Sequence, residues 1–262
     1  MRSSMARDGA TGKQPRQQKA FVCLHAAFVL QDTDSIVNMI TVHHLDDSRS
    51  QRILWLLEEL GLPHEVRKYR RDPGTMLAPP ELLKIHPLGK SPVVTDGDLT
   101  LAESGAIIEY LVECYGRGRL VPPPGSPERL RYRYWLHFAE GSAMPPLLLK
   151  LVFDRLTTAP MPFFAKPVAR GIAKKVRTLF VDPNIARQLD FMESELGRHT
   201  WFAGQEFTAA DIQMSFPLEA AAQRAGLDAS RPNLMAFLER IHARPAYRKA
   251  LERGGAYSFT SG

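Results

Sequence analysis

The chain has 262 residues and a net charge of +6, with 44% hydrophobic and 24% charged residues, a balance typical of a globular protein with one or two domains. No apolar run reaches the roughly 18–20 residues that a membrane-spanning helix needs. The two cysteines, Cys23 and Cys114, are too few for a disulfide framework or a structural zinc site. The eight histidines show no metal-ligand spacing, so we expect no metal.

Basic charge is concentrated in one segment. Residues 150–180 contain seven basic residues and a single acidic residue, Asp154. A basic helical segment can meet nucleic acid, anionic lipid or an anionic substrate. No nucleic-acid motif accompanies the segment, so we interpret it as a solvated basic face and expect no nucleic-acid partner, with membrane association as the alternative. The seven basic residues are Lys150, Arg155, Lys166, Arg170, Lys174, Lys175 and Arg177.

Residues 1–38 differ from the rest of the chain. Residues 1–19 are polar and basic, and residues 20–30 form an apolar run of 11 residues. This order resembles a signal peptide, but no cleavage site of small residues follows the apolar run. Met39 directly precedes the first convincing strand. We interpret residues 1–38 as a disordered leader or an upstream start, with a targeting extension as the alternative.

The first domain opens with a β-α-β pattern. Residues 40–44 are rich in β-branched side chains and predict a strand. Apolar residues at spacings of three and four predict a helix over residues 50–60, which ends at Gly61. Residues 65–70 predict a second strand. A strand, a helix and a further strand imply a parallel pair with a right-handed crossover.

The same domain continues with a short helix, a hairpin and a longer helix. Residues 79–85 open on proline and predict the short helix. Residues 93–95 and 99–101 predict a hairpin around the Asp96–Gly97 turn. A helix is expected from Glu103 to about Tyr115. The predicted order is therefore β-α-β-α-β-β-α.

Only helices are predicted after a linker rich in glycine and proline. We expect one long helix over about residues 128–155, with a kink or interruption at Pro145–Pro146. Residues 157–182 receive no detailed assignment. Further helices are expected at about residues 182–196, 208–225, 232–243 and 245–253. We divide the chain into an extension (1–38), a first domain (39–116), a linker (117–127), an all-helical domain (128–254) and a tail (255–262).

Ser48 lies where the first strand meets the first helix. Backbone N–H groups at a helix start favour negative charge, and the Ser48 hydroxyl could donate a hydrogen bond to a bound thiolate. Serines before helices are commonly caps, which is the simpler interpretation. Ser50 could equally be the cap, so the choice between Ser48 and Ser50 as the thiolate partner stays open.

Two further features of the first domain could bind the same ligand. If the Ser91–Pro92 bond were cis, the Ser91 backbone would turn outward and could pair with a peptide-like ligand; an ordinary loop proline is the alternative. Glu103 and Ser104 open the third helix. A hydroxyl and N–H groups at a helix start make either a carboxylate site or an ordinary cap.

Together, these positions resemble the glutathione transferase superfamily over residues 39–254. Within the superfamily, the Ser-Arg-Ser-Gln-Arg run that begins at Ser48 is similar to a bacterial and fungal group that uses serine rather than tyrosine. Thr208 and Asp211 look like the structural capping box of the family. The runs that carry the resemblance are residues 47–61, 87–93, 101–107 and 207–212.

The resemblance implies an α/β N-terminal thioredoxin-like domain followed by an all-α C-terminal domain, with glutathione as co-substrate and no other cofactor. Ser48 corresponds to the catalytic serine, whose hydroxyl stabilises the glutathione thiolate. Arg49 and Arg52 add positive field, and neither need touch the ligand. The implied glutathione contacts are Lys90 to the glycine carboxylate, backbone bonds from Ser91 beside a cis Pro92, and Glu103 and Ser104 at the γ-glutamyl end.

The implied activity is conjugation of glutathione to small hydrophobic electrophiles by a cytoplasmic homodimer, in detoxification. Two alternatives stay open: glutathione-dependent peroxide reduction by the same thiolate, and a non-catalytic binding module of the same fold. The sequence does not identify the electrophile. Candidates for its pocket lie on the long helix after the linker and could also be helix–helix core: Tyr132, Trp135, Phe138 and Met144.

Overall fold

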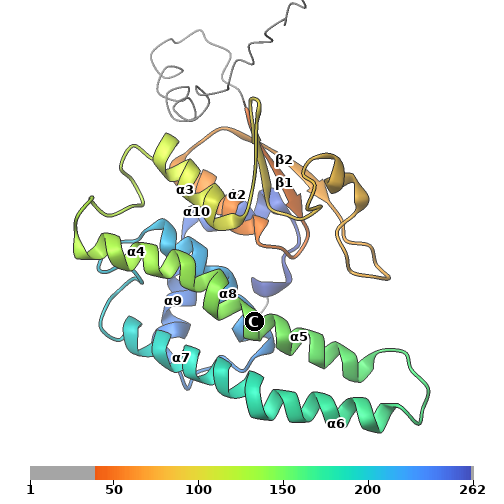
Figure 1. Cartoon of the computed structure of the whole chain (residues 1–262). Coiled ribbons are helices and arrows are strands. Elements are labelled where there is room, and N and C mark those ends of the chain that lie inside the picture. Colours follow the sequence, from red (N-terminus) through yellow and green to blue (C-terminus); the bar gives the residue numbers. More distant parts are fainter. Residues whose placement is uncertain (1–38, 261–262) are drawn as a thin grey trace, which may run out of the picture. The chain divides into compact units, whose positions relative to one another are not determined.

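A computed structural model describes residues 39–260 (Figure 1). The extension predicted for residues 1–38, and the last two residues of the tail, lie outside the described residues. The expected fold is confirmed: a four-stranded mixed sheet with helices is followed by helices only.

The sheet has the strand order β2-β1-β3-β4. Strand β1 (Ile40–Leu45) pairs in parallel with β2 (His64–Tyr69) and antiparallel with β3 (Val93–Asp96), which continues into β4 (Leu99–Ala102) as a hairpin. All six residues of β1 are buried because this strand lies inside the sheet. This buried central strand ends at Leu45, and only Asp46 and Asp47 separate it from Ser48.

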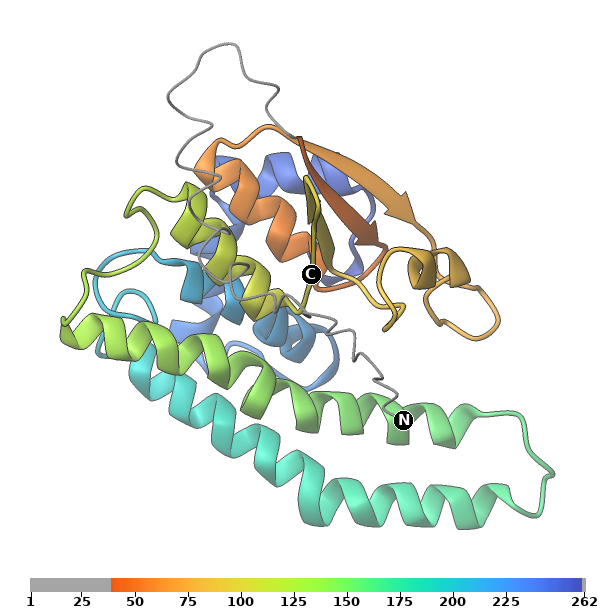
Figure 2. The same ribbon diagram turned by 45° about the horizontal axis from the view of Figure 1, so that its top comes forward.

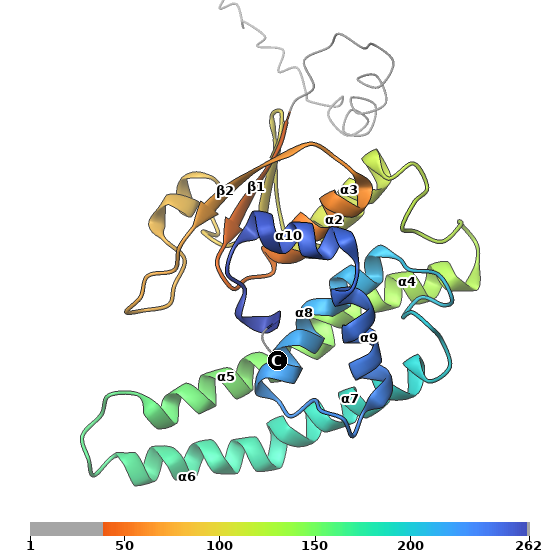
Figure 3. The ribbon, with the colours of Figure 1, turned by 180° about the vertical axis from the view of Figure 1, so that it is seen from behind.

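Three helical segments complete the first domain in the predicted order. They are α2 (Ser50–Leu60), a short 3₁₀ helix η1 (Pro80–Lys84) and α3 (Ser104–Tyr115). Helix α2 ends as predicted at Gly61, whose φ of 68° is a left-handed conformation that glycine adopts without a Cβ clash. Helix α10 (Pro245–Gly254) returns from the end of the chain to pack along α2 (Figure 3).

The long helix expected after the linker is continuous but changes its winding. Helix α4 (Pro127–Phe138) passes through a π-helical turn, η2 (Ala139–Ala143), into α5 (Met144–Thr158). The interruption therefore falls before Pro145–Pro146, which occupy the first positions of α5. There the amide that proline lacks costs little because the wider π turn has already disrupted the regular bonding.

The segment that had no assignment is helical as well. Helix α6 (Lys166–Val176), a π turn η3 (Arg177–Val181) and α7 (Asp182–Leu196) follow one another. Figure 2 shows α5 in green and α6 in teal running side by side as a hairpin. The remaining elements are α8 (Ala209–Arg224), α9 (Pro232–His242), α10 and a final 3₁₀ turn η4 (Ser258–Thr260).

Helix α8 is the centre of the helical domain, and it begins with the predicted capping box. The Asp211 carboxylate is fully buried and accepts hydrogen bonds from the Thr208 N–H (2.8 Å), the Thr208 hydroxyl (3.0 Å) and the Phe202 N–H (2.8 Å). One side chain thus joins the start of α8 to the preceding loop. The ring of Phe202 meets the Phe237 ring edge to face, with 5.0 Å between the ring centroids, inside the core.

Replacing Asp211 with alanine should destabilise the protein by about 3 kcal/mol, because two buried N–H groups lose their acceptor. Urea unfolding at one fixed protein concentration measures the change. The control is Asp190→Ala, which removes the partner of Arg231 at an exposed position and should cost less than about 1 kcal/mol. Equal losses for the two variants would contradict the assigned role of Asp211.

Candidate functional site

The loop between β1 and α2 places Ser48 at the start of a helix. The Ser48 carbonyl accepts the Gln51 N–H at 3.3 Å, so the chain already turns into α2 at this residue. The Ser48 side chain is 5% exposed and lies beside the positive end of the helix dipole. A hydroxyl in this position can donate a hydrogen bond to an anion at the loop.

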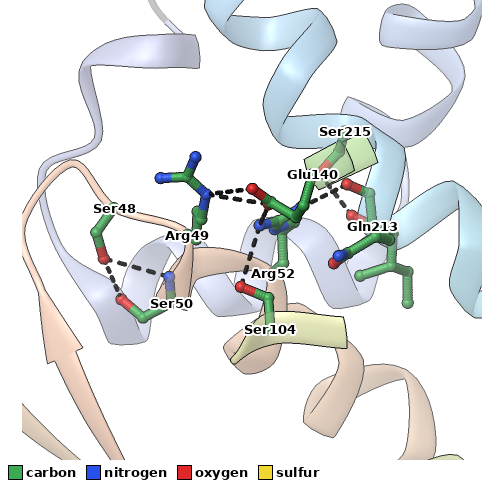
Figure 4. Close-up of polar contacts among 9 residues, drawn as sticks. Ser48, Arg49, Ser50, Arg52, Ser104, Glu140, Gln213 and Ser215 are labelled. Carbon is green, nitrogen blue, oxygen red and sulfur yellow. Dashed lines mark hydrogen bonds and ion pairs between the residues drawn. The ribbon is translucent and has the colours of Figure 1, made fainter. Parts of the chain in front are cut away.

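Ser48 and Ser50 are joined, and they differ in access (Figure 4). Their hydroxyl oxygens lie 2.7 Å apart, and the Ser50 N–H donates to Ser48 Oγ at 3.2 Å. Ser50 is 0% exposed, and its Oγ also lies 2.9 Å from His44 Nδ1 and accepts the Leu45 N–H at 3.3 Å. The surroundings of Ser50 are therefore filled by protein atoms, which leaves Ser48 as the hydroxyl closer to solvent.

The segment before β3 meets the same end of β1. The Ser91 hydroxyl donates to the His43 carbonyl at 2.8 Å and accepts the Leu45 N–H at 3.2 Å. Leu45 N–H is thus shared between Ser91 and Ser50. The Ser91–Pro92 bond is cis, which is the isomer that the resemblance implied, and Lys90 beside it is exposed.

Ser104 is held from behind at the start of α3. It is buried, and its Oγ accepts a hydrogen bond from Arg52 at 3.2 Å. The preceding residue, Glu103, is exposed and has a φ of 72°, which a non-glycine residue adopts only at a cost of about 1–3 kcal/mol. The chain keeps a strained turn here, and such turns cluster at ligand sites.

The arginine of the loop and the arginine of α2 both donate to one carboxylate, Glu140 (Figure 4). Arg52 is 1% exposed and donates to Glu140 at 2.6 Å and to the Gln213 carbonyl at 2.6 Å, and Arg49 donates to both oxygens of Glu140 at 3.0 Å. Burial alone would raise the pKa of Glu140, but Arg52 and Arg49 hold it below its usual value. Glu140 therefore offsets much of the positive field expected from Arg52.

The four candidates for a second pocket lie in different surroundings. Tyr132 and Trp135 belong to the buried helical core, where Trp135 lies 4.6 Å from the Phe202 ring. Phe138 is partly buried against Tyr134. Met144 belongs to a smaller buried cluster that approaches the Ser48 loop because Arg49 and Arg52 stack on another member, Phe216, at 5.1 and 5.4 Å.

The end of the chain, predicted only as a tail, packs against the Ser48 loop. The Ser258 N–H and hydroxyl both donate to the Asp47 carboxylate at 2.7 Å. The Tyr257 hydroxyl donates at 2.7 Å to Glu219, a buried carboxylate of α8, and the Phe259 ring lies 5.2 Å from Phe216. Asp47 opens the run of residues 47–61 that carries the resemblance, but no motif in the sequence pointed to its contact with Ser258 or to Glu219.

A cavity of about 480 Å³ in the described part of the chain lies elsewhere, between the linker and the loop before α8. Leu120, Phe207 and Glu128 line it, and none of the candidate site residues does. Among residues 39–260, no group of three or more histidine, cysteine or acidic side chains could hold a metal ion. No helix in that range is both long and apolar enough to cross a membrane.

The first domain has the element order β-α-β-α-β-β-α and a cis-proline before its third strand, so it is a thioredoxin-like domain. A helical domain follows it, which is the arrangement that the resemblance implied. The sequence profiles of the glutathione S-transferase N-terminal and C-terminal domains match residues 37–113 and 157–245. The chain belongs to the glutathione S-transferase family.

Individual relatives agree with this assignment. Glutathione S-transferase 3 of Schizosaccharomyces pombe is 38% identical over 215 residues, which cover 82% of this chain and 88% of the relative. A glutathione S-transferase structure from Actinobacillus pleuropneumoniae is 34% identical with a TM-score of 0.70, covering 86% of this chain and 97% of that one. A sphingomonad glutathione S-transferase complexed with glutathione is 25% identical with a TM-score of 0.61, covering 82% and 98%.

Replacing Ser258 with alanine should loosen the Ser48 loop, because the Asp47 carboxylate loses one of two charge-assisted hydrogen bonds. We expect deuterium exchange in the peptide that covers residues 46–49 to rise about three- to tenfold. Exchange measured by mass spectrometry tests this. The matched control is Ser230→Ala, which removes a serine–aspartate contact at Asp228, in the loop before α9. Unchanged exchange at residues 46–49 would show that the tail does not hold the loop.

Proposed function

We propose that the chain binds glutathione beside the Ser48 loop and conjugates it to small hydrophobic electrophiles, with the Ser48 hydroxyl stabilising the thiolate. The observation that carries this proposal is that three serines are tied to the end of β1 and the start of α3. Ser91 and, through Ser50, Ser48 are linked at the Leu45 N–H at the end of β1. Ser104, at the start of α3, is linked to α2 by Arg52. The glutathione-bound structure of the sphingomonad relative supports the choice of ligand.

Only a modest free energy is needed to favour the glutathione thiolate over the thiol at neutral pH. A free thiol with a pKa of about 8.5 is mostly protonated at neutral pH. Lowering this pKa by about 2 units needs about 2.7 kcal/mol in favour of the thiolate. One charge-assisted hydrogen bond from Ser48 together with the N-terminus of α2 can supply that amount. The thiolate then attacks the electrophile held next to it.

The other proposed contacts to glutathione come from Ser104, Ser91 and Lys90, each of which would bind a different part of the tripeptide. Arg52 fills one acceptor position of Ser104 Oγ, so the Ser104 hydrogen is left to donate to the γ-glutamyl carboxylate at the start of α3. The Ser91 backbone beside the cis bond would pair with the cysteinyl unit. Exposed Lys90 would meet the glycine carboxylate. For the electrophile we favour the neighbourhood of Met144, because of the four candidates its cluster lies against the loop.

Replacing Ser48 with alanine should lower kcat/KM for an aryl halide well over tenfold and raise the pKa of the bound thiol, because the thiolate loses its hydroxyl donor. Steady-state kinetics and the ultraviolet absorbance of the thiolate measure the two effects. Ser230→Ala, in the loop before α9, is the control and should match the wild type. Wild-type activity in Ser48→Ala would remove Ser48 from the mechanism. A parallel assay with an organic peroxide tests the alternative reaction.

We also propose that the protein is a homodimer joined through the α5–α6 hairpin. Both helices carry large apolar side chains that are exposed, spaced three or four residues apart on one side of each helix. A contiguous apolar surface of this kind marks an interaction site, and a second copy offers a matching one. The exposed side chains are Leu148, Val152 and Leu156 in α5 and Val168 and Ile172 in α6, with Phe164 just before α6 and Leu179 in the π turn η3. The cytoplasmic location stays a prediction.

The double variant Val168→Glu/Ile172→Glu should convert the dimer to a monomer, because four like charges would face one another across the interface. Light scattering coupled to size-exclusion chromatography measures the mass. The control variant is Arg170→Glu/Lys174→Glu, which changes charge on another side of the same helix and should stay dimeric. A monomeric wild-type protein would contradict the proposal.

A further inference from the structure

A chain of hydrogen bonds runs from the interior of the sheet to Ser48. His44 is the penultimate residue of β1, and its Nδ1 lies 2.9 Å from Ser50 Oγ, which lies 2.7 Å from Ser48 Oγ. All three side chains are buried. The chain therefore connects a histidine that cannot touch a ligand to the hydroxyl proposed to meet the thiolate.

The number of hydrogens limits how this chain can be arranged. A serine hydroxyl has one hydrogen and can accept two hydrogen bonds. The 2.7 Å contact between Ser48 and Ser50 uses one hydrogen, from one of the two hydroxyls. If Ser48 supplies it, Ser48 has nothing left to donate to a sulfur atom. Only when Ser50 supplies it can Ser48 donate to the thiolate.

The direction of the Ser50 hydroxyl depends on His44. The Ser50 hydrogen has three acceptors within reach: Ser48 Oγ at 2.7 Å, His44 Nδ1 at 2.9 Å and the Leu45 carbonyl at 3.4 Å. A hydrogen on Nδ1 removes His44 from this set and fills one acceptor position of Ser50, while the Leu45 N–H at 3.3 Å fills the other. The Ser50 hydrogen then goes to Ser48, its closest acceptor.

This arrangement fixes the hydrogen-bonding role of the Ser48 hydroxyl. Its oxygen accepts the Ser50 hydroxyl and the Ser50 N–H, the latter at 3.2 Å, so both acceptor positions are used. The remaining hydrogen of Ser48 is free to donate. With a bare Nδ1 on His44, the Ser50 hydrogen would instead have an acceptor in the imidazole, and the Ser48 hydrogen would be drawn to Ser50.

We propose that His44 is a positioning residue, whose Nδ1–H form directs Ser50 toward Ser48 and so commits the Ser48 hydroxyl to donate to the thiolate. This inference rests on the proposed function, because it concerns the same thiolate. No proton is transferred along the chain. Each hydrogen stays on its own atom, and the linked bonds strengthen one another.

The surroundings of His44 keep its imidazole neutral. Burial lowers the pKa of His44 to about 4, with Asp46 and Asp47 raising it and Lys68 of β2 lowering it to smaller extents. The neighbour from α10 is Gly254, which carries no charge, and a Cβ there would lie 3.4 Å from His44 Cε1. At neutral pH the imidazole therefore carries one hydrogen, and its position on Nδ1 or Nε2 is the variable that matters.

The position of that hydrogen can be observed directly. Nitrogen NMR of histidine-labelled enzyme saturated with glutathione should show His44 protonated on Nδ1 and bare on Nε2. The His44→Asn variant, which lacks these signals, assigns them. A glutathione-bound enzyme in which His44 is protonated on Nε2 alone would overturn the proposal.

Substitutions at His44 test the consequence for the ligand. His44→Leu removes the donor and should raise the pKa of the bound thiol and lower kcat/KM about tenfold. His44→Asn keeps an N–H donor at the same distance along the side chain and should retain most of the activity. The matched control is His43→Leu: its Nδ1 also contacts a hydroxyl, that of Tyr69 at 2.9 Å, but without a link to Ser48. It should leave the thiol pKa unchanged.

A double-mutant cycle separates positioning from a structural role. Ser50→Ala interrupts the chain, so adding His44→Leu to it should change the thiol pKa no further. An equal additional change in both backgrounds would overturn the proposal, because His44 would then act independently of Ser50. The Ser48→Ala variant distinguishes a failure of the positioning role of His44 from a failure of the proposed function. A large effect of Ser48→Ala with none of His44→Leu defeats only the positioning role, whereas no effect of Ser48→Ala defeats the proposed function as well.

Discussion

One buried cation holds the sheet domain and the helical domain together around the site. The Arg52 guanidinium is almost fully shielded from water, and a buried charge is costly unless it is paired. Its acceptors come from three elements: Ser104 at the start of α3, Glu140 in the π turn η2, and the Gln213 carbonyl in α8. Moving any of these elements would leave charge or hydrogen-bonding groups unpaired inside the protein. The relative positions of the two domains at the site are therefore set by electrostatics as well as by packing.

The same logic recurs at the two serines proposed to meet glutathione. Arg52 fills an acceptor position of Ser104, and His44 acts on Ser48 through Ser50. Arg52 donates to Ser104 directly, whereas His44 donates to Ser50, whose hydroxyl and N–H fill the oxygen of Ser48; in both cases the hydrogen of the serine is left for the ligand. Hydroxyl groups can otherwise donate in several directions, and this arrangement removes that freedom before the ligand arrives.

Sequence patterns were sufficient for most of the fold. The β-branched run of β1, the apolar spacing of α2 with Gly61 behind it, and the capping box at Asp211 are local signals, and each appears where it was predicted. The π turns η2 and η3 were missed because their pattern of apolar residues is close to that of an α-helix. Glu140 lies in one of these turns, so its ion pairs with the loop and α2 were missed with it.

The amino-acid sequence by itself determined the order of the elements in the first domain, the family and the serines proposed for the site, because these depend on residues close together in the chain. It could not determine which hydroxyl is enclosed, what pairs with Arg52, or that the end of the chain holds Asp47. The contacts of Arg52 and of Asp47 join residues 88, 161 and 211 positions apart, and they exist only once the two domains have packed. Local propensity acts over a few residues, whereas burial and the pairing of buried charge are properties of the assembled tertiary structure.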